Sequence, residues 1–162
     1  AQGVSRTEET VELLAVAQEC ADLLDYSAAR RGVAIVVQGE AAFVRAARRD
    51  AEELIYNLCD NAVRYNKEHG SVTVTVENTP GGARLCVRDT GIGIADQHRE
   101  RVFERFYRVD KSRSKETGGT GLGLAIVKHI AAGIGAQLSL ESQVGVGTAI
   151  TVQFPPLQSQ AQ

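Results

Sequence analysis

The chain has 162 residues, of which 43% are hydrophobic and 23% are charged, so it is long and apolar enough for one globular domain with a buried core. Its net charge of −2 excludes a strong overall attraction to nucleic acid or to a membrane surface. No apolar run approaches the roughly 18 residues that a membrane span needs.

The first predicted element is a helix over residues 8–31, with acidic residues early, arginines late and Gly32 as its stop. Its stripe consists of Val11, Leu14, Ala17 (or Gln18), Ala21 and Leu24. Residues 33–39 ("VAIVVQG") and 42–46 ("AFVRA") are rich in β-branched and apolar side chains, which predicts two strands.

A second helix is predicted over residues 48–66. Its apolar face comprises Ala51, Leu54, Ile55, Leu58, Cys59, Ala62 and Tyr65. Beside this face, Glu53, Asn57, Asn61 and Arg64 fall within about 80° of one another at 100° per residue. Amide and carboxylate oxygens are ligands for a hard cation, and a guanidinium fits phosphate oxygens. The stripe is therefore either a binding site or an ordinary solvated helix face, although two asparagines are poor helix formers.

Residues 71–78 ("SVTVTVEN") and 83–89 ("ARLCVRD") alternate with period two around "TPGG", which predicts a β-hairpin. Asp89 ends the second strand, and Gly91 and Gly93 allow the chain to leave it sharply. A carboxylate there can accept a hydrogen bond from an exocyclic amine, such as that of adenine. A plain turn that carries Asp and Gly is the alternative.

Residues 91–118 are predicted to be irregular, apart from a short helix near 97–103. Residues 99–115 hold seven basic and three acidic side chains. Because few aromatic residues accompany them, a small anionic ligand or an acidic partner suits this segment better than nucleic acid. Phe103, Phe106 and Tyr107 could anchor an otherwise mobile loop.

The stretch "GGTGLGL" feeds a third predicted helix at 121–132. It lacks the lysine of a GxxxxGK[ST] phosphate loop, and no strand directly precedes its GxGxxG-like spacing. A flexible glycine run at a helix amino end nevertheless favours an anion. Residues 136–142 and 148–154 are predicted strands joined by "QVGVG", and the chain ends in a polar tail.

These elements place helices and antiparallel hairpins in a mixed order. That order predicts an α+β fold, a two-layer sandwich with one mixed, mostly antiparallel sheet covered by three helices. It does not match the regular βαβ alternation of a Rossmann domain.

Four short segments in this order carry a resemblance: N-D-N within residues 57–61, D-T-G-I-G from 89, F-E-R-F-Y-R from 103 and G-T-G-L-G from 119. The set resembles the N, G1, F and G2 boxes of the sensor histidine kinases, over roughly residues 10–156. The resemblance implies a Bergerat-type ATP-binding fold with a mobile ATP lid over residues 95–118. It also implies transfer of the γ-phosphate of Mg-ATP to a histidine on a separate dimerisation domain.

The resemblance assigns the following roles. Asn57 and Asn61 would hold Mg²⁺, and Arg64 would contact phosphate. Asp89 would bind the adenine amine. Arg108 would reach the γ-phosphate, so Asn57, Arg64 and Arg108 are the expected catalytic residues. The expected nucleotide contacts also include Tyr65, Gly91, Gly93, Ile94, Tyr107, Gly119, Thr120, Gly121, Leu122, Gly123 and Leu124.

Two departures bear on the activity. The gyrase-like branch of the superfamily carries a water-activating glutamate where Asn57 stands, and Glu53 lies one turn too early to replace it. Because an amide cannot act as a general base, phosphotransfer is favoured over hydrolysis. The second departure is "AAGIGAQ" in place of the common His-Gly-Gly, which we expect to change only a local turn. The remaining alternatives are a gyrase- or chaperone-type ATPase, a serine-kinase anti-sigma factor and a nucleotide-binding pseudokinase.

The resemblance also sets expectations for the rest of the chain. Residues 1–9 are expected to end a linker from a missing dimerisation domain, residues 10–156 to form the catalytic domain and residues 157–162 a disordered tail. His69, His98 and His129 lack the acidic neighbour and the proline of a phosphoacceptor. We therefore expect a monomer that binds ATP or ADP without labelling itself. Its partners would be a histidine-bearing dimerisation domain and, downstream, a response regulator, with no nucleic acid or direct membrane contact.

The cysteines bear on the compartment. Cys20, Cys59 and Cys86 are far apart, odd in number and without a CxxC pair, which argues against a disulfide framework or a zinc site. We expect reduced core thiols in the cytoplasmic part of a membrane-bound sensor.

Overall fold

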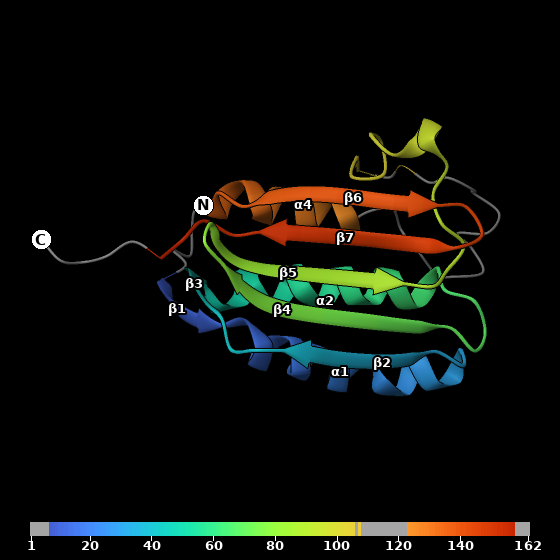
Figure 1. Ribbon diagram of the computed structural model, residues 1–162, viewed down its shortest axis with the longest axis horizontal. Coiled ribbons are helices and arrows are strands. Elements are labelled where there is room, and N and C mark those ends of the chain that lie inside the picture. Colours follow the sequence, from blue (N-terminus) through green and yellow to red (C-terminus); the bar gives the residue numbers. More distant parts are fainter. Residues whose placement is uncertain (1–6, 106, 108–122, 158–162) are drawn as a thin grey trace, which may run out of the picture.

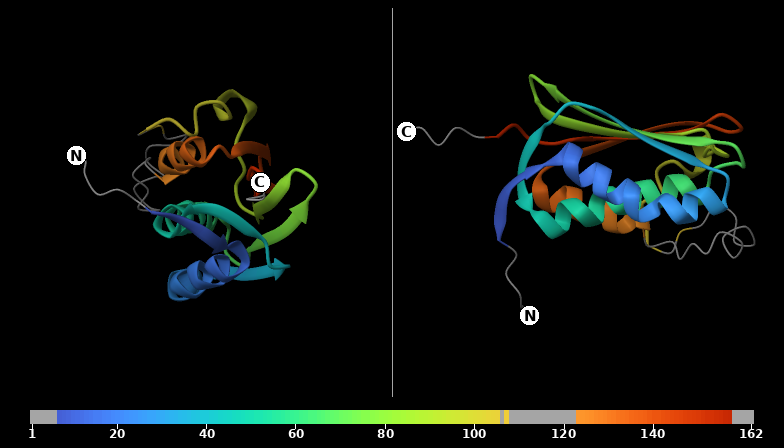
Figure 2. Two further views of the ribbon diagram at one scale, coloured as in Figure 1. Left: turned by 90° about the vertical axis from the view of Figure 1, so that its left-hand side faces the viewer. Right: turned by 90° about the horizontal axis from the view of Figure 1, so that it is seen from below.

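The molecule has two layers, a twisted sheet and a layer of helices on one of its faces (Figures 1 and 2). The computed structural model describes residues 7–105, 107 and 123–157. The sheet has the strand order β2-β4-β5-β7-β6, and only the β2–β4 pair is parallel. The strands are β2 (Ala34–Gly39), β4 (Ser71–Thr79), β5 (Gly82–Asp89), β6 (Gln137–Gln143) and β7 (Gly147–Gln153).

The helical layer consists, within the described residues, of α1, α2 and α4. These helices span Leu13–Arg30, Arg48–Arg64 and Gly123–Ile134. In Figure 2, α2 lies between α1 and α4. No helix in the described part of the chain is long and apolar enough to cross a membrane. The α+β two-layer fold with a mixed sheet under three helices is confirmed.

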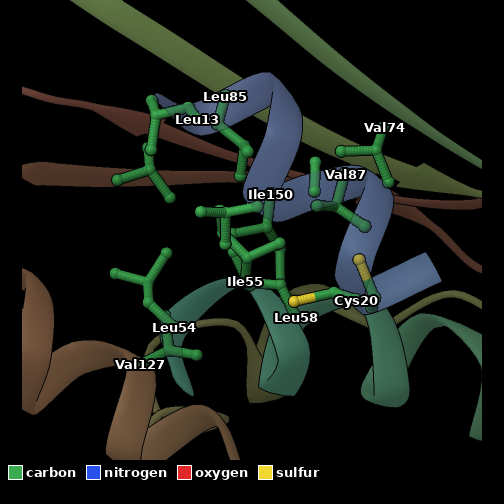
Figure 3. Close-up of a cluster of buried hydrophobic side chains, with 14 of the residues drawn as sticks. Leu13, Cys20, Leu54, Ile55, Leu58, Val74, Leu85, Val87, Val127 and Ile150 are labelled. Atoms are coloured by element: carbon green, nitrogen blue, oxygen red, sulfur yellow. The ribbon is translucent and has the colours of Figure 1, made fainter. Parts of the chain in front are cut away.

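The core fills the space between the two layers, because the strands alternate in phase. Val72, Val74 and Val76 of β4 are fully buried, whereas the residues between them are half-buried on the outer face. The apolar face of α2 meets the inner face of the sheet, as Ile55 and Leu58 do below Leu85 and Val87 in Figure 3. The predicted face of α2 is correct except at its end, where Val63 is buried and Tyr65 is only half-buried.

The predicted start of the first helix is wrong. Residues Glu8–Glu12 form strand β1, which pairs antiparallel with β3 (Phe43–Ala47) in a second, two-stranded sheet. The helix begins at Leu13 because the Glu12 side chain accepts hydrogen bonds from the backbone nitrogens of Leu14 and Ala15. Val11 is buried as expected, but opposite Val44 of β3 rather than on a helix stripe.

The predicted short helix near 97–103 is reduced to the 3-10 turn η1 (Asp96–His98), followed by further turns. Buried Val102 and half-buried Phe103 pack these turns onto the core. Helix α4 runs two residues beyond the predicted end and stops at Gly135, which takes a φ of +86°.

The cysteines divide into two environments. Cys20 and Cys59 are buried between α1 and α2, and burial raises the pKa of each thiol to about 12. Cys86 does not lie in the core as predicted. It is half-buried on the outer face of β5, because the inner positions of that strand are taken by Leu85 and Val87.

Candidate functional site

The polar stripe of α2 lies beside the start of α4. Its four members, Glu53, Asn57, Asn61 and Arg64, are all half-buried. The Nδ2 of Asn57 donates a hydrogen bond of 2.7 Å to the backbone oxygen of Glu53, which fixes the end of the amide that faces α2. The Oδ1 of Asn57 lies 3.4 Å from the point where a Cβ on Gly123 would stand. An amide oxygen therefore faces the first residue of α4, and amide oxygens are suitable ligands for a hard cation.

Arg64 occupies the last turn of α2. Its Nε donates to Oδ2 of Asp60, one turn earlier, at 2.8 Å, with both side chains partly shielded from solvent. The ion pair orients the Arg64 guanidinium at the end of the stripe that carries Asn57 and Asn61.

Asp89 marks the opposite end of the site. It follows Leu85 and Val87 in the inner register of β5, so its carboxylate faces the helical layer where the strand ends. The Oδ1 of Asp89 accepts hydrogen bonds from the backbone nitrogens of Gly91, at 2.8 Å, and Thr148, at 3.2 Å. Within the described part of the chain, no hydrogen bond reaches Oδ2. The carboxylate thus has one oxygen anchored and one that can accept a hydrogen bond from a ligand.

Burial raises the pKa of the Asp89 carboxyl above its usual value of 3.8, and the hydrogen bonds from Gly91 and Thr148 oppose this rise. A carboxylate that is shielded from water and oriented by two backbone amides is typical of a recognition site. It is better suited to accept one directed hydrogen bond than to remain a solvated surface charge.

The two glycines after Asp89 are required by close backbone contacts. A Cβ on buried Gly91 would collide with the backbone oxygen of Tyr65 and stand 3.0 Å from Oδ1 of Asp89. Gly93 takes a φ of +77°, and a Cβ there would collide with the backbone oxygen of Gln143. The turn therefore lies tightly between the end of α2 and the β6–β7 hairpin.

The β6–β7 hairpin contributes residues that the sequence analysis did not identify. The Oγ of Ser142 accepts from the backbone nitrogen of Ile94, at 2.7 Å, and lies 2.7 Å from Oγ1 of buried Thr148. The backbone oxygen of Ser142 also accepts from Nη2 of Arg99. These contacts hold the segment after Asp89 on the sheet. The glycines of "VGVGT" are the signal that could have indicated them, because Gly147 takes a φ of +146° directly against Asp89.

The other expected nucleotide contacts have different surroundings. Tyr65 is half-buried, and its backbone oxygen accepts from the nitrogen of Ile92 at 3.1 Å. Ile94 and Tyr107 are half-buried and pack against the core, and Leu124 is a buried member of it.

The structure brings two groups of predicted residues together, Asn57 with Gly123 and Tyr65 with the turn after Asp89. It does not test the remainder of the set. Phe106, Arg108, Gly119, Thr120, Gly121 and Leu122 lie outside the described residues, as does half of the expected lid.

The chain matches known proteins over most of its length. Residues 46–158 match the family described as "Histidine kinase-, DNA gyrase B-, and HSP90-like ATPase". The chain is 39% identical over 153 residues, or 94% of its length, to the sensor histidine kinase YkoH of Bacillus subtilis (strain 168). It is 50% identical over 101 residues, or 62% of its length, to the sensor-like histidine kinase SenX3 of Mycolicibacterium smegmatis. It spans about a third of YkoH (33%) and about a quarter of SenX3 (26%).

Solved structures agree with this match. A mycobacterial sensor histidine kinase, MprB, superimposes with a TM-score of 0.77 at 30% identity, over 93% of this chain and 100% of that one. Full-length ShkA, solved in complex with AMPPNP, gives a TM-score of 0.80 at 26% identity, over 98% of this chain and 34% of that one. The chain therefore belongs to the family of histidine kinase-, DNA gyrase B- and HSP90-like ATPases, and within it is the catalytic, ATP-binding domain of a sensor histidine kinase.

Proposed function

We propose that this domain binds Mg-ATP between the Asp89 turn and the α2–α4 pair, and that it transfers the γ-phosphoryl group to a histidine on a separate dimerisation domain. The observation that carries the proposal is the Asn57 amide, whose nitrogen is bonded to the Glu53 backbone while its oxygen faces Gly123. An amide can hold a cation but cannot activate water, so this position supports phosphotransfer rather than hydrolysis.

The dimensions of the site suit a nucleoside triphosphate. The Asp89 turn contacts Tyr65, the C-cap of α2, and Asn57 lies eight residues earlier in that helix. At 1.5 Å per residue, the two ends of the site are about 12 Å apart along α2. The base would lie at Asp89, with its exocyclic amine donating to Oδ2, and the phosphates at Asn57 and Gly123. The ShkA structure, which carries AMPPNP, supports a nucleotide in the equivalent fold.

Asn57 and Asn61 would hold Mg²⁺. The chemistry of the residues fits the metal, because both present amide oxygens and Asn57 already has its oxygen oriented. When bound, the cation neutralises part of the triphosphate charge. Arg64, held by Asp60, would add a positive charge beside the phosphates. Arg108, Gly119 and Gly121 would contact the phosphates, as the resemblance in the sequence implies. Catalysis would then consist mainly of positioning and electrostatic stabilisation.

The phosphoacceptor would belong to a separate domain. Of the three histidines, His69 and His129 are exposed, and His98 is bonded through Nδ1 to the Tyr107 hydroxyl. The domain would be a cytoplasmic monomer that acts on a histidine-bearing dimerisation domain of the same kinase, with a response regulator downstream.

Radioactive ATP labelled at the γ-phosphate tests the proposal. Alone, the chain should bind ATP without labelling itself. Mixed with the separately purified dimerisation domain, it should transfer label that is stable in alkali and lost in acid. Stable self-labelling would contradict the assignment of the acceptor. Nucleotide binding without transfer would instead support a pseudokinase.

A further inference from the structure

A second asparagine, Asn66, lies just beyond α2 and is bonded on both sides of its amide. Its Nδ2 donates to the backbone oxygen of Ser71, at 2.9 Å. Its Oδ1 accepts from the backbone nitrogen of Lys67, at 2.8 Å, and from Oγ1 of Thr90, at 3.2 Å. The side chain therefore connects the end of α2 to the start of β4 and to the residue that follows Asp89.

Thr90 is fixed from two directions. Its Oγ1 accepts from the backbone nitrogen of Ser71, at 2.9 Å, and its own backbone nitrogen donates to the oxygen of Ser71, at 3.1 Å. We call the three residues Asn66, Ser71 and Thr90 the polar clamp. Because Thr90 is the neighbour of Asp89, the clamp restrains the backbone from which the Asp89 carboxylate projects.

The surrounding chain leaves room for this clamp. A Cβ on Gly70 would collide with Oδ1 of Asn66 and would stand 2.8 Å from Oγ1 of Thr90. Gly70 does not have a positive φ, so space rather than backbone conformation accounts for a glycine there. On the other side of the turn, the nitrogen of Ile92 donates to the backbone oxygen of Tyr65. Side-chain and backbone contacts therefore both press the Asp89–Ile92 turn against the end of α2.

We propose that Asn66 and Thr90 are positioning residues for base recognition. Asn66 holds Thr90, and Thr90 in turn fixes the backbone that aims the Asp89 carboxylate at the exocyclic amine of the nucleotide. The inference rests on the proposed nucleotide site. Neither side chain needs to touch the ligand. Loss of the clamp lets the turn shift, and a directed hydrogen bond weakens steeply when its geometry is lost.

Inosine triphosphate separates aiming from general support of the loop. It carries a carbonyl oxygen where adenine has its amine, so it cannot donate to Asp89, whereas its triphosphate is the same. The ratio of ATP affinity to inosine triphosphate affinity therefore measures the aim of Asp89. A loop that merely became looser would lower both affinities together.

The experiment is calorimetric titration of the 162-residue chain with both nucleotides, in Mg²⁺, well below the melting temperature. Asn66→Ala and Thr90→Val should each lower the ratio about fivefold to tenfold, as expected for one misdirected hydrogen bond. The double variant should lower it no further, because the two side chains act as one unit. Thr90→Ser keeps the hydroxyl and should keep the wild-type ratio.

Matched controls are available at the far end of the sheet. The Nδ2 of Asn78 donates to the Ala41 backbone oxygen at 2.9 Å, and Oγ1 of Thr79 donates to the Gly82 backbone oxygen at 2.6 Å. Asn78→Ala and Thr79→Val remove equivalent loop bonds and should leave the ratio unchanged. A wild-type preference for ATP that survives Thr90→Val and Asn66→Ala would overturn the clamp alone. A wild-type chain without any preference would overturn both the clamp and the proposed role of Asp89.

Discussion

The two ends of the proposed nucleotide site are built from different chemical groups. At the base end, Asp89 is held by backbone amides, and the glycines at 91 and 147 lie where any Cβ would strike neighbouring backbone. At the phosphate end, the described groups that face the site are side chains of α2, and among the described residues only Oδ1 of Asn57 lies near the Cβ position of Gly123. The base end is therefore a preformed feature of the fold, whereas the described part of the phosphate end consists of exchangeable side chains.

This difference separates stability from binding. A change at the base end should disturb the local fold as well as the affinity, unless it preserves shape. A change at the phosphate end should alter ligand binding and leave the nucleotide-free domain intact. The predictions that follow test this contrast, from the largest expected effect to the smallest.

Asp89→Asn is the exception expected at the base end, because it preserves shape. It places an amide where the adenine amine needs an acceptor, so ATP affinity should fall about 100-fold or more. The raised pKa of Asp89 means that its charge destabilises the folded state once the pH rises through the folded-state value. The nucleotide-free variant should thus unfold at an equal or higher denaturant concentration at pH 7. Unchanged ATP affinity by calorimetry would exclude Asp89 from base recognition.

Gly91→Ala should damage the base end through sterics. The new methyl group would collide with the Tyr65 backbone, which costs about 1–3 kcal/mol of stability and moves the turn. Thermal unfolding should show a lower midpoint, and ATP affinity should fall with it. Gly123→Ala is the matched control at the phosphate end, where the nearest atom of the described residues lies at 3.4 Å, and its nucleotide-free melting temperature should be unchanged or higher. Equal destabilisation by the two substitutions would contradict the contrast between the two ends.

Asn57→Ala should act through the metal. Mg-ATP binding should weaken about tenfold, whereas binding of metal-free ATP should change far less, and the unfolding midpoint should stay close to wild type. Titrations with Mg²⁺ and with a chelator measure the two affinities. Equal losses under both conditions would show that Asn57 supports the pocket rather than the cation.

The preference for ATP should depend on pH through Asp89. Its carboxyl must be ionised to accept the adenine amine, and burial raises its pKa above 3.8. As the pH is lowered through the folded-state value, the ratio of ATP to inosine triphosphate affinity should fall several-fold, earlier than for an exposed aspartate. The ratio cancels the titration of the triphosphate itself. A ratio that falls no earlier than expected for an exposed aspartate would contradict the raised pKa.

The sequence predicted most elements of the fold because their patterns are local. The alternation of β4 and β5 and the apolar face of α2 each required only a short window. Strand β1 could not be found in this way, because residues 8–12 become a strand only by pairing with β3, more than thirty positions later. Cys86 was wrongly predicted to lie in the core. Its sequence neighbours Leu85 and Val87 are buried, but successive residues of a strand point to opposite faces, so Cys86 lies on the outer face.

The site divides along the same line. Residue type and spacing marked Asp89 and the α2 stripe only as candidates, and the family resemblance assigned their roles. Thr148, Ser142 and Asn66 could not be found from the sequence, because their relevance arises from contacts with residues distant in the sequence or with backbone groups. Arg108 and Gly119–Leu122 remain predictions from the sequence.

Because the three thiols are unequally buried, their alkylation can report on unfolding of the chain. Alkylating reagents attack thiolates, so Cys20 and Cys59, with pKa values of about 12 in the interior, should resist them while the fold persists. Cys86, on the outer sheet face, is the most accessible of the three. Mass spectrometry after a brief exposure to iodoacetamide would then count one modified thiol in intact molecules and three in molecules that had unfolded. The rate at which the second and third adducts appear would follow the separation of α1 from α2, with no engineered label.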